Sequence, residues 1–279
     1  MIAYFKSSSL FQLLRKYRYR LKRGKRGNVK TTLADMRNIL VNELCIKKGD
    51  SLIVHCGFGS LNANFSPADL IELLRQTVGE NGHIVMPFYP PGLSKYWLDS
   101  GRIFDPNTVT CSTGVLAQVF SQSKDVEISI HPIKAVAVWG KNAKQISEGH
   151  EHCEYPYDAG SPYYKFSQLQ NSKSIGLGVR NCSLLHMVED IFEPNKDYLY
   201  SCDKLTGKVK TFRGTHDIDT YYHHGDIPLV QSKDFIDKYC PEVMLITHAH
   251  DFVSYSISSE NLVSKVRVLF SKGVNRQCH

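Results

Sequence analysis

The chain has 279 residues, 42% of them hydrophobic, so it is long and apolar enough to bury a substantial core and is not expected to be disordered. Its formal net charge of +7 is concentrated at the N-terminus, because residues 1–30 carry ten Lys or Arg and no acidic side chain. The rest of the chain holds more acidic than basic residues, which gives no indication of nucleic-acid binding.

The sequence shows no targeting or membrane-spanning pattern. No apolar run approaches the ~20 residues of a membrane span, and the first basic cluster follows a short apolar start, whereas it precedes the apolar run in a signal peptide. The eight cysteines are scattered without a Cys-x-x-Cys pair, which favours free thiols in a reducing compartment over a disulfide framework or a zinc ribbon. We therefore expect a cytoplasmic protein.

Residues 1–30 predict a basic amphipathic helix, because Leu10, Leu14, Tyr17 and Leu21 recur at helical spacing among Lys and Arg residues. Such a helix suits peripheral contact with an anionic membrane, at its inner face. It suits packing on the body or on a second subunit equally well. We expect residues 1–30 to form this tail and residues 31–279 to form one domain, and nothing predicts the oligomeric state.

The body is expected to begin with a helix and then to alternate strands with helices. Thr32 and Asp35 form the pattern of a capping box, and an apolar stripe follows at Leu33, Met36, Leu40 and Leu44. We expect strands at 51–55, 83–88, around 128, at 135–139 and ending near 177, and helices at 67–77, 114–122, after 140, after 162 and from 183. This alternation predicts an α/β fold, a layered sheet flanked by helices, with ligands at the carboxyl ends of the strands.

Beyond Tyr198 the pattern is weaker. Residues 198–202, 208–212 and 243–247 read as strands, and residues 261–270 read as a closing helix.

The segment from Ile175 to Glu189 carries the clearest chemistry. An apolar strand end with two glycines leads into a helix that Ser183 would cap, and the exposed N–H groups of its first turn would then favour a neutral imidazole at His186. Glu189 lies three residues further on, on the same helix face, and can hold the other ring nitrogen in one tautomer. The pattern predicts a general base with an orienting carboxylate; the alternative is a histidine that merely caps or packs.

Two glycines also follow the first body strand, in the turn His55, Cys56, Gly57, Phe58, Gly59, Ser60, Leu61. Glycines let a backbone approach a ligand, and the helix opening at Ser66 offers free N–H groups to a phosphate. The turn matches neither a P-loop nor a dinucleotide fingerprint, so a plain tight turn is the alternative.

Three histidine clusters raise the question of a metal. Thr247-His248-Ala249-His250-Asp251 resembles the start of a metallo-β-lactamase motif, but the aspartate comes one place early and no histidine follows. His223-His224 and His150-Glu151-His152 are looser still, and we expect surface or loop histidines there. We predict no metal site.

Tyrosines cluster between Tyr155 and Tyr164 and again at Tyr221 and Tyr222. Aromatic loops of this kind stack on sugars or bases, or cover a core, and the residues alone do not separate the two roles.

Taken together, these segments resemble the aminoglycoside 3-N-acetyltransferase family over about residues 31–195. The segments that carry the resemblance are Gly49-Asp50-Ser51-Leu52-Ile53-Val54-His55-Cys56, Val85-Met86-Pro87, Phe104-Asp105-Pro106, Gly114 with Leu116, Ser129-Ile130-His131-Pro132 with Trp139-Gly140, Ser161-Pro162 with Lys165, and Leu185-His186-Met187-Val188-Glu189. Several positions depart from the family pattern: Cys56, Ala135 and Cys182 replace polar residues, and Ile128 replaces an arginine.

The resemblance implies an acetyltransferase domain over residues 31–279, with His186 and Glu189 as catalytic residues. The residues expected to bind acetyl-CoA, the cosubstrate, are His55, Cys56, Gly57, Phe58, Gly59, Ser60, Leu61, Thr110 and Ser112. The residues expected to bind the acceptor are Asp105, His131, Tyr157 and Ser161.

The implied reaction is direct transfer of an acetyl group from acetyl-CoA to a primary amine, with His186 as the base and backbone N–H groups stabilising the oxyanion. The tyrosine-rich segment 155–164 offers few carboxylates for a polycation. We therefore expect an amino-sugar acceptor, nucleotide-linked and in surface-glycan biosynthesis; the alternative is an aminoglycoside antibiotic. Two alternatives belong to other functional classes: a metal-dependent hydrolase and a non-catalytic binding module.

Overall fold

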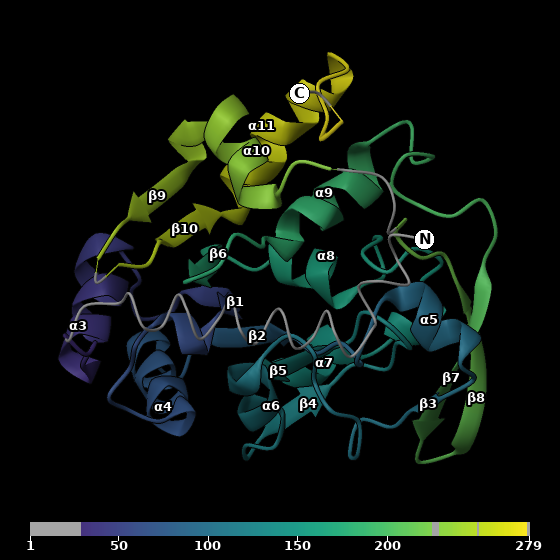
Figure 1. The fold of residues 1–279 in the computed structure, drawn as a ribbon, viewed down its shortest axis with the longest axis horizontal. Coiled ribbons are helices and arrows are strands. Elements are labelled where there is room, and N and C mark those ends of the chain that lie inside the picture. The colour runs from purple at the N-terminus through teal and green to yellow at the C-terminus, as the bar shows by residue number, and fades with distance from the viewer. Residues whose placement is uncertain (1–28, 225–228, 250, 278–279) are drawn as a thin grey trace.

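The computed structural model describes residues 29–224, 229–249 and 251–277 (Figure 1). The predicted N-terminal amphipathic helix, with its membrane contact, falls on residues outside these ranges. None of the helices in the described ranges is long and apolar enough to cross a membrane.

A seven-stranded mixed sheet, in the order β4-β5-β2-β1-β6-β10-β9, forms the centre of the described molecule. Its strands are β1 Ser51–Cys56, β2 His83–Pro87, β4 Val126–Ile128, β5 Val136–Trp139, β6 Ser172–Leu177, β9 Met244–Thr247 and β10 Ser254–Ser258. The central strands β2, β1 and β6 run parallel, and antiparallel strands extend the sheet on both sides. A second, three-stranded sheet consists of β3 Ile103–Phe104, β7 Leu205–Thr211 and β8 Gly214–Thr220.

Helices cover both faces of the large sheet (Figure 1). The α-helices are α3 Leu33–Asn38, α4 Pro67–Val78, α5 Ser94–Asp99, α6 Val115–Ser121, α7 Ala143–Ser147, α8 Pro162–Ser167, α9 Ser183–Phe192, α10 Ser232–Tyr239 and α11 Ser259–Ser271. Short turns of other helix types are η1 Ile39–Glu43, η2 Phe58–Ser60, η3 His150–His152 and η4 Pro241–Val243.

Strands β1 and β2 are mainly apolar and buried on both faces, as is usual for parallel strands between helix layers, whereas β6 is polar in its first half. Along β1, Leu52 and Val54 join the core beneath α3, α4 and α6, whereas Ile53 joins the core beneath α8 to α11. A layered α/β fold is therefore confirmed for the described chain, with two cores separated by the sheet.

Most of the predicted elements are present. Thr32 caps α3 in a full capping box with Asp35, and Ser66 does the same for α4 with Asp69. The stripe at Met36 and Leu40 is buried, but the helix passes into a π-type turn at Ile39.

The region after Tyr198 corrects the sequence interpretation. The strand predicted at 198–202 is wrong, because the segment is a turn with an isolated bridge between Tyr200 and His223 and no place in either sheet. The sequence analysis also missed α5, α10, β8 and β10. Strand β10 is polar in composition, Ser-Tyr-Ser-Ile-Ser, yet it lies buried between β6 and β9.

Candidate active site

A cavity of about 430 Å³ opens at the carboxyl ends of β1, β2 and β6, where the layered fold predicts a ligand. Its volume lies within the range of small-molecule sites. The lining residues are Val54, His55, Cys56, Met86, Pro87, Tyr89, Ser112, Thr113, Leu116, Ala117, Lys134, Tyr157, Val179, Asn181, Cys182, Ser183 and His186.

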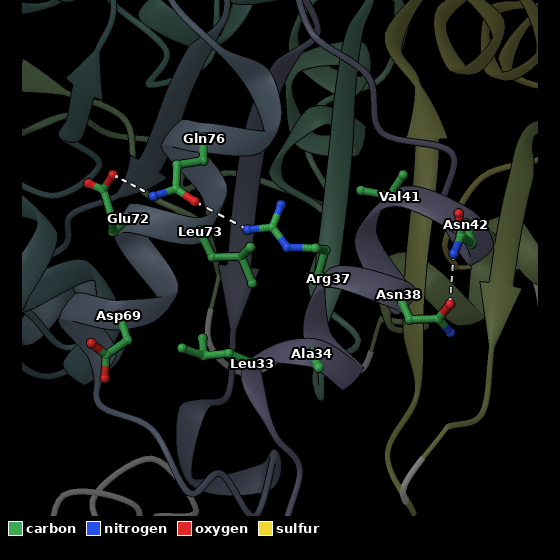
Figure 2. A pocket seen from close by; sticks show the side chains of 10 residues that line it. All are labelled: Leu33, Ala34, Arg37, Asn38, Val41, Asn42, Asp69, Glu72, Leu73 and Gln76. Carbon is green, nitrogen blue, oxygen red and sulfur yellow. Dashed lines mark hydrogen bonds between the residues drawn. The ribbon is translucent and has the colours of Figure 1, made fainter.

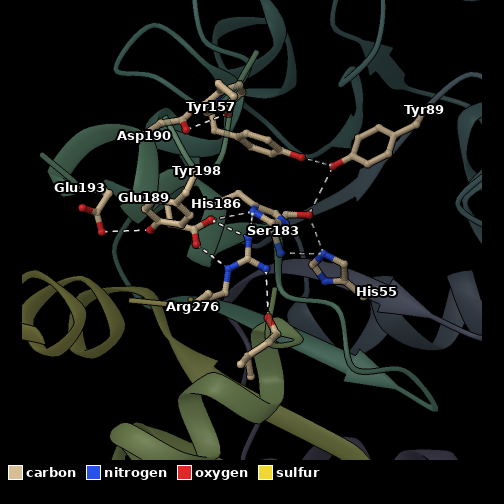
Figure 3. A network of polar contacts seen from close by, with 12 residues as sticks. His55, Tyr89, Tyr157, Ser183, His186, Glu189, Asp190, Glu193, Tyr198 and Arg276 are labelled. Atoms are coloured by element: carbon tan, nitrogen blue, oxygen red, sulfur yellow. Dashed lines mark hydrogen bonds and ion pairs between the residues drawn. The ribbon is translucent and has the colours of Figure 1, made fainter. Parts of the chain in front are cut away.

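His186 projects from α9 into this cavity and is held by an ion-paired network (Figure 3). Its Nδ1 lies 2.9 Å from Oε2 of the fully buried Glu189. Arg276 donates from Nε to Glu189 Oε1 at 2.5 Å and from Nη2 to Oε2 at 3.1 Å. The carboxylate therefore has a guanidinium on one side and the imidazole on the other.

The Glu189 contact assigns the tautomer of His186. Arg276 Nη2 also lies 3.3 Å from Nδ1, but this contact is longer and both groups would be donors if Nδ1 carries the proton. Because a carboxylate can only accept, we assign the proton to Nδ1, which leaves Nε2 with its lone pair. Nε2 makes no hydrogen bond within the described residues, so it can accept a proton from a ligand.

The surroundings keep this imidazole neutral. Burial, followed by the Arg276 charge, lowers the pKa of His186 below its usual value of 6.5, against the opposing effect of Glu189. Burial alone would raise the pKa of Glu189, but Arg276 and His186 outweigh it and the net shift is downward. Near pH 7 the pair is a neutral imidazole beside an ionised carboxylate.

The start of α9 differs from the predicted one. Ser183 is not the N-cap; Cys182 holds that position without a side-chain cap, and His186 is the fourth helical residue. The Ser183 hydroxyl instead lies 2.8 Å from His55 Nε2, which also accepts the Ser183 backbone N–H at 3.1 Å. Burial lowers the pKa of His55 to about 4, so this ring is neutral and ties β1 to α9.

Two tyrosines complete the wall beside the base (Figure 3). The Tyr89 hydroxyl lies 2.9 Å from that of Tyr157, whose ring centroid is 5.3 Å from the His186 ring. The Asp190 carboxylate accepts the Tyr157 backbone N–H at 3.0 Å, which holds the tyrosine segment against α9. His223, expected as a surface or loop residue, is partly buried with its ring centroid 4.9 Å from that of His186.

The residues predicted to bind acetyl-CoA divide into two groups. His55, Cys56 and Ser112 line the cavity, whereas the segment 57–61 follows β1 without lining it, and Thr110 lines a separate groove with Trp97. Gly57 is required by close packing, since a Cβ there would lie 2.9 Å from the Gly178 carbonyl oxygen. Burial raises the pKa of the Cys56 thiol, so it is not a thiolate nucleophile at neutral pH.

Of the residues predicted to bind the acceptor, Tyr157 lines the cavity and the other three lie elsewhere. Asp105 is paired with Lys210 at 3.0 Å, and the buried Ser161 caps α8. His131 is fully buried, and its Nδ1 accepts the backbone N–H groups of Ile133 and Lys134 at 3.2 and 3.1 Å. These contacts indicate structural roles for the three side chains.

The histidine motifs do not converge. His150 is buried, with contacts to Ser129 at 2.9 Å and to the Pro156 carbonyl oxygen at 2.9 Å, so a surface position is wrong for this residue. His248 is exposed, and His250 lies outside the described residues. Within the described ranges, no three His, Cys, Asp or Glu residues are grouped closely enough to hold a metal ion.

A larger groove of about 730 Å³ lies between α3 and α4 (Figure 2). Its polar side chains bond mainly to each other, for example Arg37 to Gln76 at 3.2 Å and Gln76 to Glu72 at 3.0 Å. The groove contains no histidine or cysteine, so the smaller cavity is the one with catalytic chemistry.

A known protein family matches the part of the chain that forms the cavity. The family model described as aminoglycoside 3-N-acetyltransferase matches residues 53–253, which include most of β1, the described residues that line the cavity, and α9. The chain belongs to this family.

A curated relative in the family is the aminoglycoside N(3)-acetyltransferase IV of Salmonella sp., 32% identical over 160 residues. The alignment covers 56% of this chain and 58% of that protein, so it spans little more than half the length of either.

Solved structures share the fold over a longer range. A structure of AAC-IIIb in binary complex with CoASH superposes with a TM-score of 0.71 at 17% identity, covering 88% of this chain and 98% of that one. The AAC(3)-IVa apoenzyme gives 0.70 at 22% identity, covering 89% and 91%. AAC-VIa bound to sisomicin gives 0.70 at 15%, covering 88% and 99%.

Sequence reasoning missed three side chains of this site: Tyr89 and Lys134, which line the cavity, and Arg276, which pairs with Glu189 behind His186. Arg276 is 90 residues from His186 and lies beyond the last predicted helix, so no local spacing indicates it. Lys134 lies two residues after Pro132, where a segment that carries the family resemblance ends. This proximity was the signal in the sequence that could have indicated Lys134.

Proposed function

We propose that the protein is an acetyl-CoA-dependent N-acetyltransferase acting on a primary amine of a sugar. One observation carries the proposal: a neutral imidazole, His186, lines the cavity with Nδ1 fixed by the Glu189–Arg276 pair and Nε2 available. A positioned base of this kind is what an amine nucleophile requires, because the amine must lose a proton to attack.

His186 and Glu189 have different roles in the proposed acetyl transfer. His186 Nε2 accepts a proton from the amine as its nitrogen attacks the thioester carbonyl carbon. The new C–N bond forms, the C–S bond breaks, and the proton on His186 is available to the leaving thiolate. Glu189 stabilises the transient imidazolium and remains ionised throughout.

Acetyl-CoA as the donor is supported by family membership and by the relative whose structure holds CoASH. The cavity also fits a thioester. It is reached at the ends of the parallel strands, it has apolar walls at Met86 and Leu116, and it is lined by Tyr89, whose hydroxyl is a neutral donor. A neutral donor of this kind suits a carbonyl oxygen that gains charge during attack.

Two classes of acceptor carry a primary amine on a sugar: aminoglycosides and nucleotide-linked amino sugars. The relatives are named for aminoglycosides, and structures of relatives hold gentamicin or sisomicin, which supports an aminoglycoside better than the nucleotide-linked amino sugar expected from the sequence. An acceptor with fewer positive charges is favoured by one observation on this chain: no Asp or Glu is among the described residues that line the cavity.

The test is release of CoA thiol from acetyl-CoA with a panel of amines: gentamicin, sisomicin, apramycin, glucosamine and a nucleotide-linked amino sugar. We expect at least one sugar amine to be turned over. His186→Asn should lower kcat by roughly 100-fold or more with little change in CoA affinity, because general-base catalysis contributes about 10²–10⁴-fold.

The two alternative functions, a binding module and a metal-dependent hydrolase, predict different results. A binding module would bind CoA without releasing thiol, and a metal-dependent hydrolase would lose activity with a chelator and regain it with zinc. Either result would contradict the proposed function.

A further inference from the structure

Lys134 is a cation without a counter-ion in the same cavity as the base. It lines the cavity together with His186, and its Nζ lies 4.5 Å from the centroid of the Tyr89 ring. No ion pair or hydrogen bond joins its ammonium to any residue that the structure describes. In contrast, the other cation near the site, Arg276, is fully engaged by Glu189.

The protein holds this lysine in place through its backbone. The Lys134 N–H donates to His131 Nδ1 at 3.1 Å, and the Lys134 carbonyl oxygen accepts the Tyr163 hydroxyl at 3.2 Å. Burial keeps the His131 pKa well below its usual value, so the ring stays neutral and can accept. Both His131 and Tyr163 are fully buried, so a rigid part of the core presents Lys134 to the cavity.

The charge is present at neutral pH. Burial lowers the pKa of Lys134 to about 8, which leaves most of the lysine protonated at pH 7. The His55, His186 and His223 rings near it have lowered pKa values and are neutral, and the Glu189 charge is balanced by Arg276. The cavity therefore carries one uncompensated positive charge from described residues.

We propose that Lys134 binds an anionic oxygen group, a phosphate or a carboxylate, of the acceptor, and so selects amino sugars that carry a negative charge. The inference rests on the proposed function and specifies its acceptor. An anionic group near Lys134 would supply a counter-ion that the described residues do not, whereas a polycationic acceptor would meet a like charge in a cavity with no Asp or Glu among its described lining residues.

CoA is the other source of phosphate in the reaction. Its phosphate groups are separated from the thioester by the pantetheine arm, whereas Lys134 lines the same small cavity as the base that meets the thioester. Tyr89 links the two groups: the lysine lies over its ring, and its hydroxyl lies 2.9 Å from that of Tyr157, whose buried ring packs on His186. This arrangement suits an acceptor whose amine faces His186 while its anionic group faces Lys134.

The experiment compares matched sugars. Binding of glucosamine, glucosamine 1-phosphate and glucosamine 6-phosphate to the CoA-saturated protein is measured by titration calorimetry, and thiol release is followed in parallel. We expect at least one of the phosphorylated sugars to bind about 10-fold or more tightly than glucosamine, as a charge-assisted hydrogen bond allows.

Variants assign the preference to Lys134. Lys134→Met should abolish it, and Lys134→Arg should retain most of it because the charge remains. Lys141→Met removes the same charge from an exposed position seven residues away and should leave the preference intact.

Three results would overturn the inference alone. Equal binding of neutral and phosphorylated sugars by the unaltered protein would do so while leaving the proposed function in place. A loss of acetyl-CoA affinity in Lys134→Met, with the sugar preference intact, would assign the lysine to CoA. Equal losses of kcat with every acceptor would assign it to the oxyanion. Absence of thiol release with every amine would instead overturn the proposed function, and the inference with it.

Discussion

The two walls of the cavity treat charge in opposite ways. On what we call the paired wall, His186 lines the cavity and the buried Glu189 and Arg276 lie behind it; each charge has a partner within 3.1 Å and the imidazole is fixed in one tautomer. On the unpaired wall, formed by Lys134 and Tyr89, a cation faces an aromatic ring and no carboxylate among the described residues. On the paired wall, the charge partners of the base are in place before a substrate binds. On the unpaired wall, a substrate would supply the counter-ion of the lysine.

The largest expected effect comes from breaking the paired wall at Arg276. Arg276→Met leaves the buried Glu189 carboxylate without its guanidinium, and we expect a loss of about 3–5 kcal/mol in the free energy of unfolding. Because the Arg276 charge lowers the pKa of His186, its removal should also shift the acid limb of the rate profile to higher pH. Denaturant unfolding and pH-dependent kinetics measure the two effects; stability within 1 kcal/mol of the unaltered protein would contradict the pairing.

Glu189→Gln should act on catalysis more than on stability. The amide keeps the size but cannot hold the Nδ1 proton with the same charge, so we expect kcat to fall by about 10- to 100-fold, less than for loss of the base itself. Glu189 raises the pKa of His186, and its replacement also leaves the Arg276 charge without a counter-ion. Both changes lower the pKa of His186, so the acid limb should move to lower pH. An upward shift would show that Glu189 is not the partner of the catalytic ring.

On the unpaired wall, His131→Leu should loosen the support of Lys134. Two buried backbone N–H groups lose their acceptor, which costs about 1–3 kcal/mol. We expect calorimetric sugar binding to show a weaker preference for phosphate. The Lys134 charge also lowers the pKa of His186, though less than the Arg276 charge does, so the acid limb should move by less than in Arg276→Met. A shift as large as in Arg276→Met would contradict the division between the two walls.

Ser183→Ala is expected to have the smallest effect. Ser183 is not the helix cap, and His55 Nε2 keeps the backbone N–H of residue 183 when the hydroxyl is removed. We expect a change in kcat/KM of less than about 5-fold, in line with the loss of one hydrogen bond worth about 1 kcal/mol. A loss of 100-fold would make Ser183, with His55 as its partner, part of the chemistry.

The paired wall was partly predictable because His186 and Glu189 are three residues apart on one helix, where spacing implies contact. Arg276 was not predictable in this way, since only the tertiary fold brings the end of the chain to α9. The neutral state of His186 was expected from a helix start capped by Ser183. In the structure it follows from burial and from Arg276, so the conclusion holds for a different reason.

In the rest of the fold, too, local sequence predicts some features, whereas others depend on the tertiary structure. Strands β1 and β2 are apolar runs and were recognisable, as was the apolar end of β6, whereas β10 is polar in sequence and yet lies buried between β6 and β9. His131 was assigned to the acceptor from its place in a recognisable segment. Its burial shows that it supports the backbone around Lys134 instead.

The pH dependence of kcat/KM tests the central claim, that His186 is the neutral general base, most directly. Because its pKa lies below 6.5, we expect a single acid limb of unit slope below pH 6.5, with the rate falling as the imidazole is protonated. His186→Asn should be roughly 100-fold less active and should lack this limb. A limb that persists unchanged in His186→Asn, or an asparagine variant with full activity, would contradict the account.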